Sequence, residues 1–316
     1  MSQHEIVSDM PPERSAANTA RPTVALALGA GGAKGLTHIG VIEELEAQGF
    51  QIVAIAGSSM GALIGGIHAM GKLDVYRDWV CALAKFDVLR LVDWTFSGGG
   101  LIKGERIIGT LRGMIGDIQI EELPLAFTAV ATDLDRGREV WLSHGSLFDA
   151  IRASISVPTV FRPHPLHGRR LVDGALLNPV PVTPLIGARA DYLFAVSVDG
   201  AAEASSAETP PREPVDESSY RHKIGEFISR LMPQGEAQPR AQGTLDTLTQ
   251  AMDLMQANLS RLRLAAYAPD LLIEMPRNIA SVYEFYRARE LIERGRLQAR
   301  AALANWPAPN GPLRSA

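Results

Sequence analysis

Ser59 lies between Gly57 and Gly61 in the pattern Gly-x-Ser-x-Gly, a spacing that suits nucleophilic catalysis. The apolar, β-branched run Ile52–Ala56 is typical of a buried strand, and the run Ala62–Met70 is typical of a helix. A serine at a sharp strand-to-helix turn is exposed as a nucleophile, and glycines two positions away let strand and helix converge. The pattern predicts a nucleophile elbow at Ser59. The alternative is an ordinary tight turn in a glycine-rich chain.

A glycine-rich segment at residues 29–35, Gly-Ala-Gly-Gly-Ala-Lys-Gly, directly follows the strand predicted at Thr23–Leu28. Such glycines let backbone N–H groups turn outward and line a site for an anion. A P-loop needs Ser or Thr after its lysine, but glycine follows Lys34. A dinucleotide fingerprint that began at Gly29 would need glycine in place of Lys34 and an acidic residue at the end of the second strand. Neither is present. An oxyanion hole facing Ser59 is therefore the favoured use of this loop.

The base that would activate Ser59 is not marked among the 7 histidines of the chain. An α/β-hydrolase triad places its histidine late, after the serine and the acid, yet no histidine follows His222. Asp173 is the better candidate, because it ends a short predicted strand and precedes Gly174. A carboxylate there could take the serine proton without an intermediate histidine. Asp-Gly taken alone is mostly a turn signal.

The glycine loop, the Gly-x-Ser-x-Gly elbow and the later Asp-Gly-Ala together resemble the patatin-like phospholipase family, in particular its bacterial branch of small single-domain members. The resemblance covers about Val24 to Val198, and it includes residues 150–158, 161–163 and 178–181. It implies an α/β fold with three layers, α/β/α, around a mainly parallel central sheet. It also implies a hydrolase that uses a Ser-Asp dyad.

The same resemblance assigns roles to residues. Ser59 would be the nucleophile and Asp173 the base, with the motif glycines Gly57, Gly61 and Gly174 in support. Backbone amides of the glycine loop would form the oxyanion hole, at Gly31, Gly32, Ala33 and Lys34.

Ala30 departs from the family pattern, which has glycine there. The change is harmless unless the backbone at Ala30 requires a positive φ, in which case an alanine would be strained.

The remaining pattern alternates strand and helix up to about Asp199, which predicts a largely parallel sheet flanked by helices. Residues Phe86–Gly104 are predicted to form a mobile loop. Further elements are a helix at Gly35–Ala47 and strands at Leu125–Ala131, Glu139–Leu142 and Tyr192–Val198.

Composition shifts divide the chain into four parts. We expect a disordered tail at 1–22, a patatin-like catalytic core at 23–199 and a flexible insertion at 200–243. Within the insertion, Ile224–Met232 has the spacing of a short amphipathic helix, which could contact a membrane, cover a pocket or bind a partner. Residues 244–316 are expected to pack on the core as helices Thr244–Leu264 and Ala280–Leu303 with the strand Leu271–Met275 between them.

The bulk composition excludes several classes of function. Among 316 residues, Lys+Arg number 31 against Asp+Glu 35, and a net charge of -4 argues against a nucleic-acid binder.

The lone Cys81 cannot form an internal disulfide and lies in an apolar run, which favours a packed thiol. No Cys/His cluster or acidic loop has the spacing of a zinc or calcium site, so no metal or other cofactor is expected. No apolar run is long enough to span a bilayer. We expect a cytoplasmic protein, with any membrane contact made at the surface.

These observations predict a serine acyl hydrolase, a phospholipase, lysophospholipase or esterase that cleaves carboxylic esters of lipids through an acyl-enzyme. Two alternatives stay open. An acyltransferase would pass the acyl group from the same serine to an alcohol or thiol, and a regulatory or scaffold protein would keep the site only as a vestige. The lipid, the bond cleaved and the oligomeric state are not encoded in these motifs.

Overall fold

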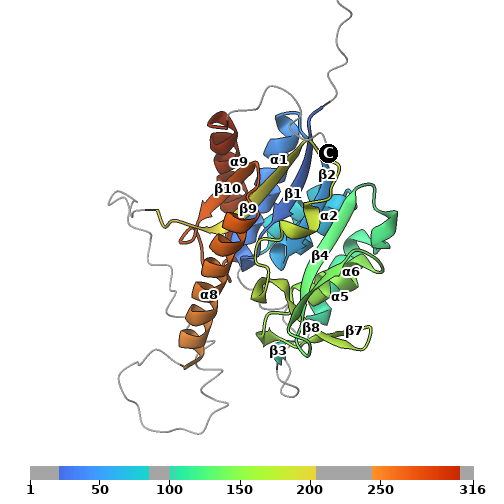
Figure 1. Cartoon of the computed structure of the whole chain (residues 1–316). Coiled ribbons are helices and arrows are strands. Elements are labelled where there is room, and N and C mark those ends of the chain that lie inside the picture. The colour runs from blue at the N-terminus through green and yellow to red at the C-terminus, as the bar shows by residue number, and fades with distance from the viewer. Residues whose placement is uncertain (1–20, 85–99, 103, 204–243, 307–316) are drawn as a thin grey trace, which may run out of the picture.

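A sheet of eight strands forms the centre of the protein in a computed structural model, which describes residues 21–84, 100–102, 104–203 and 244–306 (Figure 1). The strands follow the order β10-β9-β1-β2-β4-β8-β7, and β5 pairs with β4 off this path. The pairs β10–β9, β9–β1, β1–β2 and β2–β4 are parallel, whereas β5, β8 and β7 add antiparallel pairs at one side. The strands are β1 (Thr23–Leu28), β2 (Gln51–Ser58), β4 (Ala126–Asp133), β5 (Arg138–Leu142), β7 (His164–Leu166), β8 (Arg169–Asp173), β9 (Tyr192–Gly200) and β10 (Leu271–Pro276).

Alternation along the strands divides the interior into two cores, one on each face of the sheet. In β1, Val24, Leu26 and Leu28 belong to the larger core, which also includes aliphatic side chains of the helices on that face. Ala25 and Ala27 point to the other face, where a thinner core includes residues 180–185. Large side chains thus meet the main helical layer, and alanines leave room for close packing on the opposite face.

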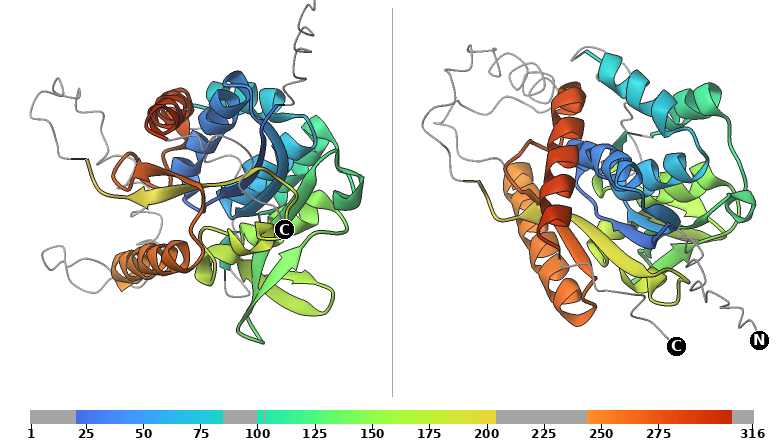
Figure 2. Two further views of the ribbon diagram at one scale, coloured as in Figure 1. Left: turned by 45° about the horizontal axis from the view of Figure 1, so that its top comes forward. Right: turned by 90° about the horizontal axis from the view of Figure 1, so that it is seen from above.

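Helices cover both faces and complete the predicted three layers. The helix pair α1 (Thr37–Ala47) and α9 (Ala288–Ala304) lies on one side of the sheet, and α8 (Thr244–Ala266) lies on the other (Figure 2). The expected fold class, α/β/α with a mainly parallel sheet, is confirmed. The remaining helices are α2 (Met60–Ala69), α3 (Leu73–Ala82), α5 (Glu105–Ile115) and α6 (Leu147–Ser154).

The C-terminal elements extend the same sheet. The strand predicted at Leu271–Met275 is β10, which pairs in parallel with β9. The helix predicted at Ala280–Leu303 begins later than expected, at Ala288, after a single 3-10 turn at Phe285–Arg287. Among the preceding residues, Val282 accepts a hydrogen bond from the Ala33 amide of the glycine loop through its carbonyl oxygen.

The loop predicted at Phe86–Gly104 needs a correction at its end. Residues Gly100–Ile102 form a short strand, β3, which pairs in parallel with β6 (Thr159–Phe161), so this part is ordered by a partner distant in sequence. Residues 85–99 lie outside the described residues. So do most of the predicted tail and almost all of the predicted insertion at 200–243, including the amphipathic segment Ile224–Met232. In the part of the chain that is described, no helix combines the length and apolar character needed to cross a bilayer.

Candidate active site

Ser59 occupies the turn between β2 and α2 in a strained backbone conformation, with φ 54° and ψ −121°. Such a conformation costs a non-glycine residue about 1–3 kcal/mol and persists only where the surroundings enforce it. The flanking glycines permit the turn. A Cβ on Gly57 would lie 2.4 Å from the amide nitrogen of Ala62, and one on Gly61 would lie 2.1 Å from the carbonyl oxygen of Leu28. The sharp turn expected at this serine is therefore present.

The backbone amide of Ser59 points into the protein. It donates a hydrogen bond of 3.0 Å to Oγ of Ser154, the last residue of α6. The Ser154 hydroxyl in turn donates to the carbonyl oxygen of Val130 in β4, at 2.6 Å. Because its amide is used in this way, Ser59 does not offer its own N–H to an oxyanion.

Asp173 ends β8 beside this turn. The strand β4 lies between β2 and β8, since its residues pair with β2 on one side and with β8 on the other. Asp173 is 3% exposed, and its Oδ1 accepts a hydrogen bond of 2.8 Å from the amide of Ala175. Its Oδ2 makes no hydrogen bond of ordinary geometry. The register of these pairs, in which Ser58 lies opposite Val130 and Asp173 opposite Ala131, thus brings the two predicted catalytic residues together.

Burial and hydrogen bonding act in opposite directions on the Asp173 carboxyl. Desolvation raises its pKa to about 6, while the Ser59 hydroxyl and the Ala175 amide, as hydrogen-bonding groups, moderate the rise. The Ser59 hydroxyl is therefore near enough to affect the carboxyl, although their contact does not close into an ordinary hydrogen bond. Hydrogen bonds between catalytic groups are often long before substrate binds. A carboxylate with this pKa can accept a proton near neutral pH.

Gly174 allows this approach. A Cβ at that position would lie 2.2 Å from the carbonyl oxygen of Val130 and 3.1 Å from Oγ of Ser58. Ser58 is itself fixed by a hydrogen bond of 2.6 Å to the carbonyl oxygen of Asn178. The glycine after Asp173 is needed for packing against β2 and β4 and is more than a turn signal.

The glycine loop has fewer available amides than the four predicted for an oxyanion hole. The amide of Ala33 donates to the carbonyl oxygen of Val282 at 2.9 Å, and that of Lys34 donates to the carbonyl oxygen of Gly31 at 3.1 Å. Within the described residues, the amides of Gly31 and Gly32 have no hydrogen-bond partner. In this conformation the loop offers the N–H groups of Gly31 and Gly32.

Two contacts hold the loop in place, one to the sheet and one to the segment after Asp173. The Lys34 ammonium lies 3.4 Å from a carboxylate oxygen of Asp199 at the end of β9. Ala30 donates its amide to the carbonyl oxygen of Pro179 at 2.9 Å. Ala30 is not among the described non-glycine residues with positive φ, which are Ser59 and His167, so alanine causes no strain there.

Two histidines have pKa values lowered by burial. The Nε2 atom of His38 lies 2.7 Å from the carbonyl oxygen of Gly29, and burial lowers the pKa of His38 to about 4. Its ring is therefore neutral at physiological pH and donates to the first residue of the glycine loop. Burial also lowers the pKa of His68 in α2 to about 4.

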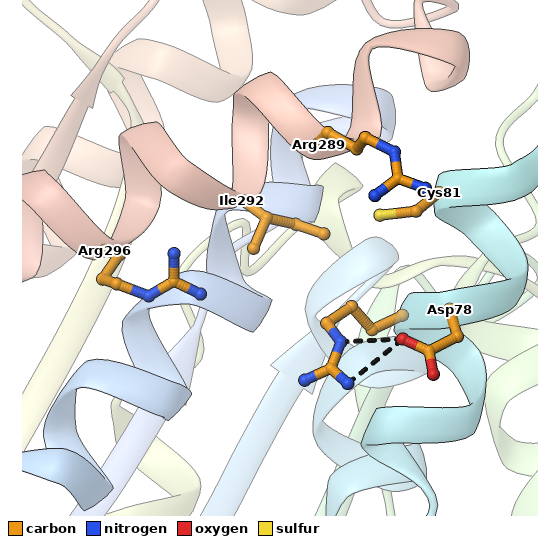
Figure 3. Close-up of a pocket in the computed structure, with 6 residues that line it drawn as sticks. Asp78, Cys81, Arg289, Ile292 and Arg296 are labelled. Carbon is orange, nitrogen blue, oxygen red and sulfur yellow. Dashed lines mark hydrogen bonds and ion pairs between the residues drawn. The ribbon is translucent and has the colours of Figure 1, made fainter.

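A separate concavity of about 300 Å³ lies between α3 and α9 (Figure 3). Its lining includes neither Ser59 nor Asp173, and it is formed by Arg77, Asp78, Cys81, Arg289, Ile292 and Arg296. Cys81 is half-buried there, at the margin of the core, and burial raises the pKa of its thiol. A raised pKa disfavours the reactive thiolate. Neither this concavity nor any other part of the described residues contains a group of three or more His, Cys, Asp or Glu side chains placed to hold a metal ion.

Two residues that contact the site, Ser154 and Val282, carry no signal for it in the sequence. Ser154 lies in the segment 150–158 that contributed to the resemblance, but nothing in its spacing shows that its hydroxyl meets Ser59, 95 positions earlier. Val282 contacts the loop through a backbone carbonyl, which any residue type could supply.

Comparisons with known proteins show what this chain is similar to. Residues 26–186 match the family described as patatin-like phospholipase. An uncharacterized NTE family protein of Mycobacterium bovis is 37% identical over 89% of this chain and 91% of its own length. The lysophospholipase nte1 of Emericella nidulans is 30% identical over 55% of this chain and 12% of its own length. Among solved structures, VipD from Legionella pneumophila aligns over 90% of this chain and 67% of its own, with a TM-score of 0.44 and 14% identity.

Proposed function

This chain belongs to the patatin-like phospholipase family, and on that premise we propose that it hydrolyses carboxylic esters of lipids through a Ser59–Asp173 dyad. The general class, a lipid esterase, has support from the family and from the similarity to a lysophospholipase. One observation supports the dyad most strongly. A buried carboxyl with its pKa raised to about 6 lies beside the hydroxyl of a serine in a strained strand-to-helix turn.

In the first step, the Asp173 carboxylate accepts the proton of the Ser59 hydroxyl while Oγ attacks the ester carbonyl carbon. The carbonyl oxygen becomes an oxyanion. Collapse of the tetrahedral intermediate breaks the bond to the alcohol, which leaves with the proton held by Asp173. In the second step, Asp173 removes a proton from water, and the hydroxide attacks the acyl-enzyme. Release of the carboxylic acid returns the proton to Ser59.

For the oxyanion hole we propose the amides of Gly31 and Gly32. The amides of Ser59, Ala33 and Lys34 already donate to acceptors of the protein, which leaves this pair of loop donors available. The N-terminus of α2 begins at Met60, so its positive end lies next to the attacking oxygen and adds stabilisation of negative charge. Removing one hole donor in another hydrolase costs about 10²–10³ in kcat.

Activity of Ser59→Ala tests this proposal. The variant should fold like the wild type, because alanine is no more strained at this φ than serine, and it removes only the nucleophile. Hydrolysis of p-nitrophenyl butyrate and of a lysophospholipid should fall by about 10³-fold or more. Full activity in a folded Ser59→Ala protein would show that another group carries the reaction.

A further inference from the structure

Ser154 contacts the nucleophile without reaching the site where substrate would react. Its hydroxyl accepts a hydrogen bond from the Ser59 amide at 3.0 Å and donates one to Val130 in β4 at 2.6 Å. Ser154 is 0% exposed. A buried hydroxyl with both a donor and an acceptor partner has a fixed orientation.

This hydrogen bond acts on the residue whose conformation is strained. The positive φ of Ser59 turns its amide away from the helical path, toward α6. An amide that lost its partner there would be buried and unsatisfied, which favours a different backbone conformation at Ser59. The direction of Oγ depends on that conformation.

The residues just after α6 also contact Asp173, the proposed base. Two residues beyond Ser154, the carbonyl oxygen of Ser156 accepts a hydrogen bond of 3.0 Å from the amide of Asp173. The segment 154–156 thus contacts the backbones of both dyad residues, one through a side chain and the other through the main chain. Only the first of these contacts can be removed by substituting a side chain.

We propose that Ser154 is a positioning residue, which holds the Ser59 backbone in the conformation that directs its hydroxyl toward Asp173. The proposal rests on the proposed function of Ser59 and extends it to a residue of α6. Ser154 takes no part in bond making, since it is buried and its only hydroxyl proton is donated to Val130. Its loss should slow the chemistry and leave substrate affinity unchanged.

The test compares three variants of the full-length chain by the rate of fluorophosphonate labelling, mapped to a residue by mass spectrometry, and by kcat and KM for p-nitrophenyl butyrate. Ser154→Ala removes the hydroxyl. Ser154→Cys keeps a side chain of similar size that forms weaker hydrogen bonds. Ser260→Ala is the matched control, because Ser260 is also buried but bonds only within α8, to Gln256.

Ser154→Ala should lower the labelling rate at Ser59 and kcat by about 10- to 100-fold, the usual penalty for a misplaced catalytic group. KM should not move. The midpoint of the pH–activity profile should move to higher pH, because a displaced Ser59 hydroxyl no longer lowers the pKa of Asp173. Ser154→Cys should be intermediate, and Ser260→Ala should match the wild type.

The outcomes separate the two claims. A folded Ser154→Ala protein that is labelled within about twofold of the wild-type rate would overturn the role of Ser154 and leave the proposed function standing. If Ser154→Ala does not fold, wild-type rates in Ser154→Cys would overturn it equally. A wild-type protein that is not labelled at Ser59 would remove both claims.

Discussion

The hydroxyl of Ser59 lies beside the buried carboxyl of Asp173, close enough to lower its pKa, although β4 separates the strands that carry them. The strands β2 and β8 run in opposite directions, and the register of their pairing with β4 brings their ends together: Ser58 pairs with Val130, and Asp173 pairs with the next residue, Ala131. A carboxylate can therefore reach the serine directly, as the proposed Ser59–Asp173 dyad requires.

The pH dependence of activity should follow the Asp173 carboxyl. A general base works in its ionised form, and burial raises the pKa of Asp173 to about 6. We expect kcat/KM to fall about tenfold per pH unit below that value and to be level above it. A profile with its acidic limb near pH 4 would contradict a desolvated base.

Replacing Asp173 should separate activity from stability. Asp173→Asn removes the base, so kcat should fall by several orders of magnitude.

The pKa of Asp173 in the folded protein, about 6, exceeds the ordinary value of 3.8, so between these values the folded protein holds a proton that the unfolded chain has lost. Wild-type stability therefore falls as pH rises from about 4 to about 6, by about 3 kcal/mol if the shift is fully expressed.

Asp173→Asn lacks that titration. Urea unfolding should show the variant as more stable than the wild type at pH 8 and nearly equal to it at pH 4. A variant that is less stable than the wild type at pH 8 would mean that the carboxylate is stabilised in the folded protein, against the burial argument.

Gly61 should not tolerate a side chain. A Cβ there would lie 2.1 Å from the carbonyl oxygen of Leu28 in β1, and backbone atoms in a central strand cannot move aside cheaply. Gly61→Ala should lose about 3 kcal/mol or more of unfolding free energy, measured by urea denaturation. Gly109→Ala is the control, because Gly109 lies inside α5 with open space around it and should gain about 0.5–1 kcal/mol. Equal stability of the two variants would contradict the close packing of the elbow on β1.

Ala30→Gly should change little. Ala30 does not have a positive φ, so the glycine that is usual in the family would relieve no strain. We expect kcat/KM within about twofold of the wild type, and a loss of about 0.4–1 kcal/mol from the greater freedom of the unfolded chain. A tenfold gain in activity would show that alanine restrains the loop.

The parts of the fold that follow local patterns were predictable. The strand at Thr23–Leu28 has the predicted bounds, because a short apolar run between a proline and a glycine-rich segment leaves little ambiguity. The strand β3 was missed, because its order comes from pairing with β6, which no local pattern reveals. The contact of Val282 with the glycine loop, before α9 begins, is likewise a long-range one that no local pattern reveals.

In the candidate site too, local patterns were predictable from the sequence and long-range contacts were not. Residue types and order along the chain pointed to Ser59 and Asp173. Which loop amides remain available could not be read from the sequence, because Ala33 gives its N–H to a carbonyl far along the chain. The contact of Ser154 with Ser59 could not be predicted either, because a buried serine near a helix end has many possible partners.

Intact-mass analysis after reaction with a fluorophosphonate tests the central claim most directly, because the reagent requires an activated serine. The wild type should gain one adduct per chain, mapped to Ser59, and Ser59→Ala should gain none. Labelling of the wild type should also weaken below about pH 6, as Asp173 becomes protonated. A folded wild-type protein that stays unmodified, or that is modified equally after Ser59→Ala, would contradict the assignment of Ser59 as the nucleophile.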